Sequence, residues 1–267
     1  MENWKNTAKL IRSLKDKKVR DETGLFVVEG EKMVLEALES DFQVESVFIS
    51  KEDCLARIRQ ASEKGNPDCA VEMISTAMME KISLLSSPSY CLALVRKKTG
   101  NFDWKGLCKK GVLALALDGV RDPGNIGTIL RLSDWFGVDI LFASDEMSRY
   151  PTSDIYNPKV VQATMGAIFR KKLIYANLPE VAAFFQENGM KVYGTFLDGS
   201  NIYQTVLEDK GLIVMGNESM GISPEIEECG PERLLIPPYP LDAISSESLN
   251  VATATAITLS EFRRRQG

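Results

Sequence analysis

Three polar segments of this chain each follow an apolar run and carry residues that could bind a ligand. The first follows VLALALD and contains Asn125 and Arg131. The second, GNESMG from Gly216, follows GLIV, and the third follows LLIPP and ends in Ser248-Leu249-Asn250. Polar groups collected at the strand ends of an α/β sheet are where small ligands usually bind. This arrangement predicts a ligand site without naming the ligand.

Each segment also has a simpler interpretation. Asp122-Pro123-Gly124-Asn125 reads as a Pro-Gly turn in which Asn125 caps the next helix. GNESMG lacks the lysine of a P-loop and the spacing of a dinucleotide fingerprint, so a simple turn explains it. Ser248 fits the N-cap of the last helix. Arg131 lies among apolar residues one helical turn beyond Gly127, where a guanidinium requires an anion or carbonyl partner; the alternative is an ion pair with a nearby carboxylate.

The residue types exclude several kinds of chemistry. The chain has no histidine, which removes serine–histidine and cysteine–histidine mechanisms and the usual general base. Its five cysteines form no C-x-x-C pair and do not match a zinc site, so no metal is expected. Scattered cysteines favour a reducing cytoplasm. No apolar run approaches the ~20 residues of a membrane span, and the N-terminus is no secretory signal.

Charge is unevenly distributed along the chain. The net charge of −5 by itself disfavours a nucleic-acid partner. Residues 1–20, however, hold seven lysines and arginines against two acidic residues, and further basic clusters occur at 96–110, 170–172 and 263–265. Solvated helix faces and tails are the alternative explanation. Several basic clusters on an acidic protein indicate a local phosphate-binding surface.

The elements are expected to form two α/β domains. From Leu25 to Lys98, short apolar runs alternate with helical patterns, which predicts a layered domain with a largely parallel sheet. The second half opens with a run suited to a strand buried on both faces. A helix is expected at about 126–136 with Gly137 as the residue that ends it. Asn157-Pro158 predicts a helix start, and the last helix is expected at about 248–265. The predicted boundaries are a first domain at 1–98, a linker at 99–111 and a second domain at 112–267.

Taken together, the motifs resemble the SpoU/TrmH family of RNA ribose methyltransferases. Asn125, Gly127 and Arg131 reproduce that family's N-x-G-x-x-x-R pattern. The run from Lys9 to Leu38 looks like the substrate-binding domain that precedes the methyltransferase domain in many members. Two departures are SSPSYCLALV in place of a Thr-Pro-Gln-Gly-like stretch, and Ser133 where alanine is common. The segments that resemble the methyltransferase domain are Leu117–Asp139, Asn157–Arg170, Gly211–Ile226 and Leu234–Gln266.

The resemblance implies the fold, the cofactor and the site residues. It implies a C-terminal SPOUT-type parallel sheet with a deep trefoil knot, preceded by a small α/β domain resembling a ribosomal protein. S-adenosylmethionine would lie bent in the knot, and the family usually works as a homodimer. The positions that match the cofactor contacts are Thr195, Gly216, Ile236 and Leu249. The positions that match the catalytic polar residues are Asn125, Arg131, Glu218, Ser248 and Asn250.

The implied function is methyl transfer from S-adenosylmethionine to a ribose 2′-hydroxyl of RNA. Ribosomal RNA is the expected substrate because of the N-terminal domain, and transfer RNA is the alternative. A non-catalytic RNA-binding protein that keeps the fold is a third interpretation. An ordinary Rossmann-type methyltransferase is disfavoured because no glycine-rich loop follows a first strand. Arg131 is expected to steady the developing alkoxide or an adjacent phosphate, since a guanidinium stays protonated.

Overall fold

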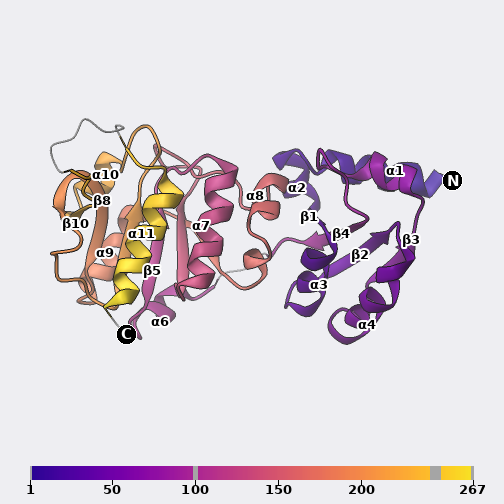
Figure 1. Ribbon diagram of the computed structural model, residues 1–267, viewed down its shortest axis with the longest axis horizontal. Helices are drawn as coiled ribbons and strands as arrows, with labels where there is room; N and C mark the ends of the chain where they lie inside the picture. The colour runs from indigo at the N-terminus through magenta and orange to yellow at the C-terminus, as the bar shows by residue number, and fades with distance from the viewer. Residues whose placement is uncertain (1, 99–101, 241–247, 266–267) are drawn as a thin grey trace. The chain divides into compact units, whose positions relative to one another are not determined.

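The chain folds into two compact units. The computed structural model describes residues 2–98, 102–240 and 248–265 (Figure 1). Unit 1 consists of the described residues of Met1–Gly100 and Asp154–Arg170. Unit 2 consists of the described residues of Asn101–Ser153 and Lys171–Gly267. Within the described ranges, no helix has both the length and the apolar character to span a bilayer.

Unit 1 is built on a four-stranded sheet with the strand order β1-β4-β2-β3. The expected alternation of strands and helices is present (Figure 1). Its elements are α1 (Glu2–Ser13), α2 (Lys17–Thr23), β1 (Leu25–Glu29), α3 (Glu31–Glu39), β2 (Val44–Ile49), η1 (Glu52–Cys54), α4 (Leu55–Gly65), β3 (Ala70–Met73), α5 (Thr76–Ile82), β4 (Cys91–Arg96), α8 (Pro158–Ala163) and η2 (Ala167–Phe169).

The expectation of a largely parallel sheet in this unit is wrong. β4 pairs antiparallel with both β1 and β2, and only the β2–β3 pair is parallel. The cause lies between β3 and β4. The amide of Ile74, just after β3, donates to the carbonyl of Ile49 at the end of β2, and the amide of Ser50 donates to the carbonyl of Tyr90, just before β4. The chain therefore leaves β3 and enters β4 at the same edge of the sheet. The seven-residue helix α5 does not return the chain to the opposite edge of the sheet. For this reason β4 runs in the direction opposite to that of β2 and β3.

One face of this sheet is covered by α1 and α5. Ile11 and Leu14 pack with Leu25, Val27 and other buried apolar side chains in one cluster. The ring of Trp4 lies edge-on to the ring of Phe48 on β2, with 5.3 Å between the centroids. The amphipathic N-terminal segment is therefore a docked helix, as its apolar spacing predicts.

Residues 154–170 belong to unit 1 although they lie between two strands of unit 2 in the sequence. Arg20 is 1% exposed, and its Nε and Nη2 donate to Oδ2 of Asp154 at 3.0 and 2.7 Å. Its Nη1 donates to the carbonyl of Leu14. The ring of Tyr156 packs against that of Phe26 at 4.7 Å. A buried guanidinium thus joins the start of the chain to this distant segment.

Replacing Arg20 with methionine is expected to cost unit 1 about 3–5 kcal/mol, because the Asp154 carboxylate would stay buried without its partner. Hydrogen exchange at the β1 amides measures this free energy. The control is Lys18→Met, which removes an exposed pair with Glu22 at 3.9 Å and should cost less than about 1 kcal/mol. Equal losses in the two variants would contradict the stabilising role of the buried Arg20–Asp154 pair.

Unit 2 is built on a six-stranded sheet with the order β10-β8-β9-β5-β6-β7, and every strand pairing is parallel. The parallel sheet expected for this half is confirmed. Its elements are α6 (Trp104–Cys108), β5 (Leu113–Leu117), α7 (Pro123–Trp135), β6 (Ile140–Ser144), β7 (Leu173–Ala176), α9 (Leu178–Glu187), β8 (Val192–Asn201), β9 (Gly211–Met215), α10 (Pro224–Glu227), β10 (Glu232–Leu235) and α11 (Val251–Arg264).

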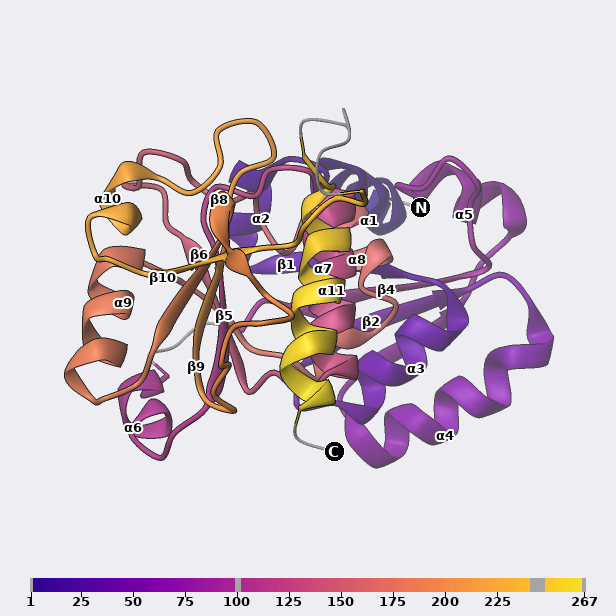
Figure 2. The same ribbon diagram turned by 60° about the vertical axis from the view of Figure 1, so that its left-hand side comes forward.

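Helices cover both faces of this sheet. The helix α6 lies in the segment that the sequence analysis assigns to the linker, of which residues 99–101 are outside the described part of the chain. Its Cys108 is buried with Phe142, Phe185 and other apolar residues of the sheet and of α9. On the other face, α7 and α11 lie side by side (Figure 2). All five residues of β5 are buried, as a strand covered on both faces requires.

The pair α7–α11 is fastened at the end of α7. Gly137 has φ +63°, which confirms it as the left-handed residue that ends the helix. The guanidinium of Arg263 on α11 donates to the carbonyls of Phe136 and Gly137, each at 2.6 Å. These bonds satisfy carbonyls that the end of a helix leaves without partners.

Two buried hydroxyls of this helix pair have no hydrogen bond within the described structure. They are Oγ of Ser133 on α7 and Oγ1 of Thr258 on α11. Both residues are fully buried. A buried hydroxyl without a partner costs about 1–3 kcal/mol, so the serine at this position carries a cost that alanine would not.

We expect Ser133→Ala to stabilise unit 2 by about 1 kcal/mol. Ser260→Ala on the exposed side of α11 is the matched control, because it brings the same gain in helix propensity without removing a buried hydroxyl. Thermal unfolding of both variants measures the difference. A lower stability of Ser133→Ala than of the parent would show that the hydroxyl has a partner in solution.

Candidate active site

The carboxyl ends of four neighbouring strands hold the three motifs. In the order β10-β8-β9-β5, Ile236 follows β10, Gly216 follows β9, and Asp118 follows β5. Thr195 on β8 comes directly after Gly194, which pairs with Val214 of β9. The sheet places β6 on the other side of β5, so the loops after β5 and β9 flank the point where strand order reverses. Open α/β sheets bind ligands at such a point.

Asp122, rather than Asn125, caps α7. Its Oδ1 accepts from the backbone amide of Asn125 at 2.8 Å, and Pro123 occupies the first helical position. The interpretation of Asn125 as the cap is therefore wrong. Two polar residues compete for the cap at this helix start, and the one before the proline takes it. The side chain of Asn125 is left to bind elsewhere.

The amide of Asn125 joins all three motifs. Its Nδ2 donates to Oε1 of Glu218 at 2.9 Å, and its Oδ1 accepts from Nδ2 of Asn250 at 2.9 Å. These partners lie 93 and 125 residues further along the chain. Three of the five predicted catalytic residues therefore form one hydrogen-bonded series.

Asn250 also starts α11. Its Oδ1 accepts from the amides of Ala252 and Thr253, and the helix begins at Val251. The interpretation of Ser248 as the N-cap is wrong, since Ser248 lies two residues earlier and is exposed. Residues 241–247 of the third motif lie outside the described part of the chain.

The loop after β9 is held at both ends by residues that follow β5. Nδ2 of Asn217 donates to the carbonyl of Gly119 at 2.6 Å, and Oδ1 of Asn217 accepts from the amides of Ser219 and Met220. At the other end, the amide of Ser223 donates to Oδ2 of Asp118 at 2.6 Å. The loop therefore has a fixed shape relative to the first motif.

Asp118 was not singled out from the sequence, and Asn217, a polar group at the end of its strand, was not among the predicted site residues. Asp118 is 3% exposed. Burial raises the pKa of its carboxyl above the usual range, and the hydrogen bonds from Ser223 oppose that rise. A carboxylate directly after a wholly apolar strand was the available signal, because a buried carboxylate requires hydrogen-bond donors.

Among the described residues, three of the four predicted cofactor positions have backbone groups without hydrogen-bond partners. Within the described structure, no hydrogen bond occupies the amide or carbonyl of Gly216, Ile236 or Leu249. A Cβ on Gly216 would lie 2.4 Å from the backbone carbon of Gly221 and 2.5 Å from the nitrogen of Ile222. Thr195 is half-buried, with its Oγ1 3.9 Å from Sδ of Met215. This edge can therefore offer backbone donors and acceptors to a flat polar ligand.

Arg131 is exposed and makes no hydrogen bond or ion pair with the described residues. The alternative of an ion pair with a nearby carboxylate has no support among the described residues. The helix α7 buries Ile129, Leu130 and Ser133 and turns Arg131 outward with Trp135, which is 85% exposed. The guanidinium is thus available to an anion from outside the described residues.

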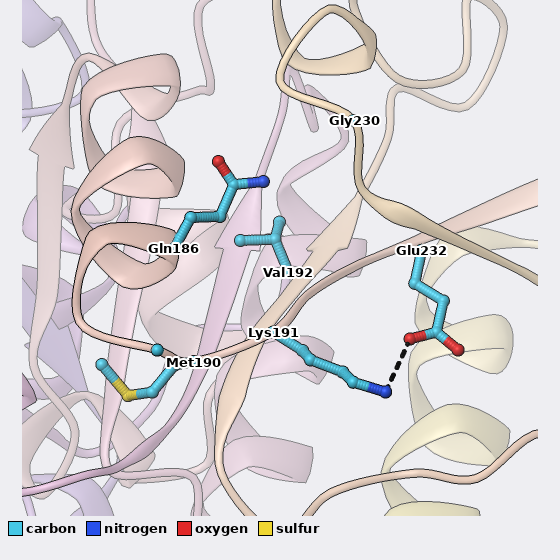
Figure 3. Close-up of a pocket in the computed structure, with 7 residues that line it drawn as sticks. Gln186, Met190, Lys191, Val192, Gly230 and Glu232 are labelled. Atoms are coloured by element: carbon cyan, nitrogen blue, oxygen red, sulfur yellow. Dashed lines mark ion pairs between the residues drawn. The ribbon is translucent and has the colours of Figure 1, made fainter.

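A hollow of about 320 Å³ lies at the opposite edge of this sheet (Figure 3). Lys191 and Val192 line it where β8 begins, and Nζ of Lys191 lies 3.2 Å from Oε2 of Glu232 at the start of β10. It contains none of the motif residues. Since parallel sheets bind ligands at their carboxyl ends, this hollow is not the candidate site.

Comparisons with known proteins agree with this geometry. The SpoU rRNA Methylase family matches residues 112–260, and the MRM3-like substrate binding domain matches residues 5–93. The chain belongs to the SpoU family. This membership confirms the resemblance inferred from the motifs.

Relatives of this SpoU-family chain cover nearly its whole length. It is 30% identical over 260 residues to the 23S rRNA (guanosine(2553)-2′-O)-methyltransferase RlmP of Bacillus subtilis, which covers 94% of each chain. A TrmH-family protein from Porphyromonas gingivalis matches with a TM-score of 0.82 and 35% identity, covering 97% and 98% of the two chains. An rRNA methyltransferase from Sinorhizobium meliloti, solved with bound AdoMet, matches with a TM-score of 0.81 and 27% identity, covering 97% and 94%.

Gly216→Ala is expected to weaken S-adenosylmethionine binding about 10- to 100-fold, because the added methyl group overlaps the backbone of residues 221–222 and reshapes the loop. Isothermal titration calorimetry measures the affinity. The control is Gly230→Ala, where φ is +67° but the added atom meets nothing within 4 Å. It should lower stability and leave the affinity unchanged. An unchanged affinity in Gly216→Ala would contradict the assignment of the loop after β9 to cofactor binding.

Proposed function

We propose that this SpoU-family chain transfers a methyl group from S-adenosylmethionine to a ribose 2′-hydroxyl of ribosomal RNA. The observation that carries the proposal is the series Glu218–Asn125–Asn250, which joins three motifs at one sheet edge. The name of the relative RlmP supports ribosomal RNA as the substrate. The matched substrate-binding domain in residues 5–93 supports an RNA partner.

The residues at this edge fit the cofactor. S-adenosylmethionine supplies a methyl group on a positively charged sulfur, which is electrophilic without a metal. We assign Gly216, Ile236 and Leu249 to its binding through their unoccupied backbone groups, with Thr195 beside them. Leu249 is 46% exposed and offers an apolar surface at the same place.

The chain's own residues position and stabilise the reacting hydroxyl. The reaction forms a bond between the 2′ oxygen and the methyl carbon, breaks the methyl–sulfur bond and releases the hydroxyl proton to solvent. Because a guanidinium is a cation with several N–H donors, Arg131 stabilises the developing negative charge on the oxygen or holds the neighbouring phosphate. Asn125, Glu218 and Asn250 hold the first turn of α7 against the cofactor loop, and Ser248 orients the ribose.

Methyl transfer to purified RNA tests this proposal. The protein is incubated with methyl-labelled S-adenosylmethionine and either unmodified ribosomal RNA or unmodified transfer RNA. Label in ribosomal RNA supports the proposal, and label in transfer RNA alone would show that the substrate class is wrong. RNA binding without transfer, with the cofactor bound, would favour a non-catalytic RNA-binding protein.

Arg131→Ala should lower the turnover number about 100- to 1,000-fold and leave the affinity for S-adenosylmethionine nearly unchanged, because the guanidinium acts on the hydroxyl and not on the cofactor. Single-turnover methyl transfer and calorimetry measure the two effects. Arg131→Lys keeps the charge without the planar fork and should restore part of the rate. Loss of cofactor binding in Arg131→Ala would refute this role.

We further propose a homodimer, a trefoil knot and a cytoplasmic location. The outward side of α7, with Trp135 and Arg131, supports a dimer, since an exposed tryptophan is typical of an interface. Sedimentation equilibrium tests it, and a monomer would contradict it. For the knot, the support is membership of the SpoU family, whose fold implies it. Five free cysteines support a reducing compartment.

A further inference from the structure

The structure divides the cations of the four basic clusters into those with a partner in the fold and those without. At 96–98, 170–171 and 263–265 the cations bind acidic side chains or backbone carbonyls, whereas Lys109 and Lys110 of the second cluster have no side-chain partner in the described structure. Such partners reduce what these clusters can offer to an external anion. The pairs are Arg96–Glu45, Lys97–Asp21, Lys98–Asp41, Arg170–Glu36, Lys171–Val138, Arg263–Phe136, Arg264–Glu261 and Arg265–Glu261.

The N-terminal cluster keeps three unpaired cations on one helix. Lys5, Lys9 and Arg12 are exposed, and none of them forms an ion pair or hydrogen bond with the described residues. Of the other cations of this cluster, Lys17 pairs with Asp21, Lys18 lies 3.9 Å from Glu22 and Arg20 is buried, while Lys15 is also exposed without a partner in the described structure but lies beyond the end of α1. We call Lys5, Lys9 and Arg12 the α1 stripe.

The α1 stripe has a fixed geometry. Spacings of four and three residues place its members on one side of the helix, about 6 and 4.5 Å apart along the axis. The apolar side of α1 is docked on the sheet through Trp4 and Ile11. The three charges therefore sit on an ordered helix and not on a free tail.

We propose that the α1 stripe binds backbone phosphates of the RNA substrate. The inference rests on the proposed function. A chain with a net charge of −5 repels RNA overall, so attraction must come from local cations without acidic partners. Each cation that neutralises a phosphate releases counterions, which gives affinity without sequence preference. The stripe lies on the unit that matches a substrate-binding domain, whereas Arg131 lies on unit 2.

The test compares two triple variants of equal charge change. The first is Lys5→Gln, Lys9→Gln and Arg12→Gln. The control is Lys64→Gln, Lys109→Gln and Lys110→Gln, which removes three exposed cations that also lack partners in the described structure. The probe is unmodified 23S ribosomal RNA transcribed in vitro, titrated at several salt concentrations. Calorimetry with S-adenosylmethionine and thermal unfolding show that both variants are folded.

The stripe variant is expected to bind RNA about 100-fold more weakly at about 0.1 M salt, with a salt slope smaller by about 2, and to bind the cofactor normally. The control should change the slope by much less. An unchanged slope in the stripe variant, or equal changes in both variants, would overturn the proposal. If the triple variant does not fold, Lys9→Glu replaces it and must weaken RNA binding without affecting the cofactor.

Failure of this inference is distinguishable from failure of the proposed function. If the parent methylates RNA and the stripe variant binds RNA as well as the parent, the stripe has no role and the function stands. If the parent binds RNA with a stripe-dependent salt slope but transfers no methyl group, the surface stands and the proposed reaction is wrong.

Discussion

The active-site edge depends on one side chain amide. Asn125 donates to Glu218 and accepts from Asn250, so it joins the first turn of α7, the loop after β9 and the start of α11. An amide suits this place because it offers a donor and an acceptor at once, whereas a carboxylate would face Glu218 with like charge. Asp118 and Asn217 bind the loop after β9 to the residues that follow β5. Arg263, near the end of α11, binds the end of α7. Bare backbone at Gly216 and Ile236 is presented next to this frame.

The basic residues fall into those that bind within the fold and those that are available to an external anion. Most basic clusters of the sequence are used within the fold, either in ion pairs or on helix carbonyls. Arg131 and the α1 stripe have no partner in the described structure, which is also true of Lys109 and Lys110, but the stripe places three such cations on one side of an ordered helix. A guanidinium on the outward side of α7 and three cations on α1 are both suited to phosphate. The first is proposed to act at the reacting ribose, and the others lie on the unit that matches a substrate-binding domain.

Much of the fold could be predicted from the sequence, and particular residues show where prediction stopped. The apolar run of β5, the helix start at Asn157-Pro158 and the end of α7 at Gly137 are confirmed, since each depends on local sequence. The prediction that β4 is parallel to its neighbours was wrong, because alternating apolar and polar side chains do not show in which direction a strand runs. Packing of residues 154–170 on unit 1 depends on Arg20, 134 residues away from Asp154. SpoU membership is confirmed, while the roles of Arg131, Ser248 and the cofactor positions stay predictions.

The central claim is that the assembled edge directs methyl transfer to a ribose oxygen and not to a base. Alkaline digestion of RNA labelled by the protein tests it directly. A methyl group on the 2′ oxygen blocks the attack of that oxygen on the adjacent phosphate, so the label should remain in alkali-resistant dinucleotides. Label recovered in mononucleotides would place the methyl group on a base and contradict the account.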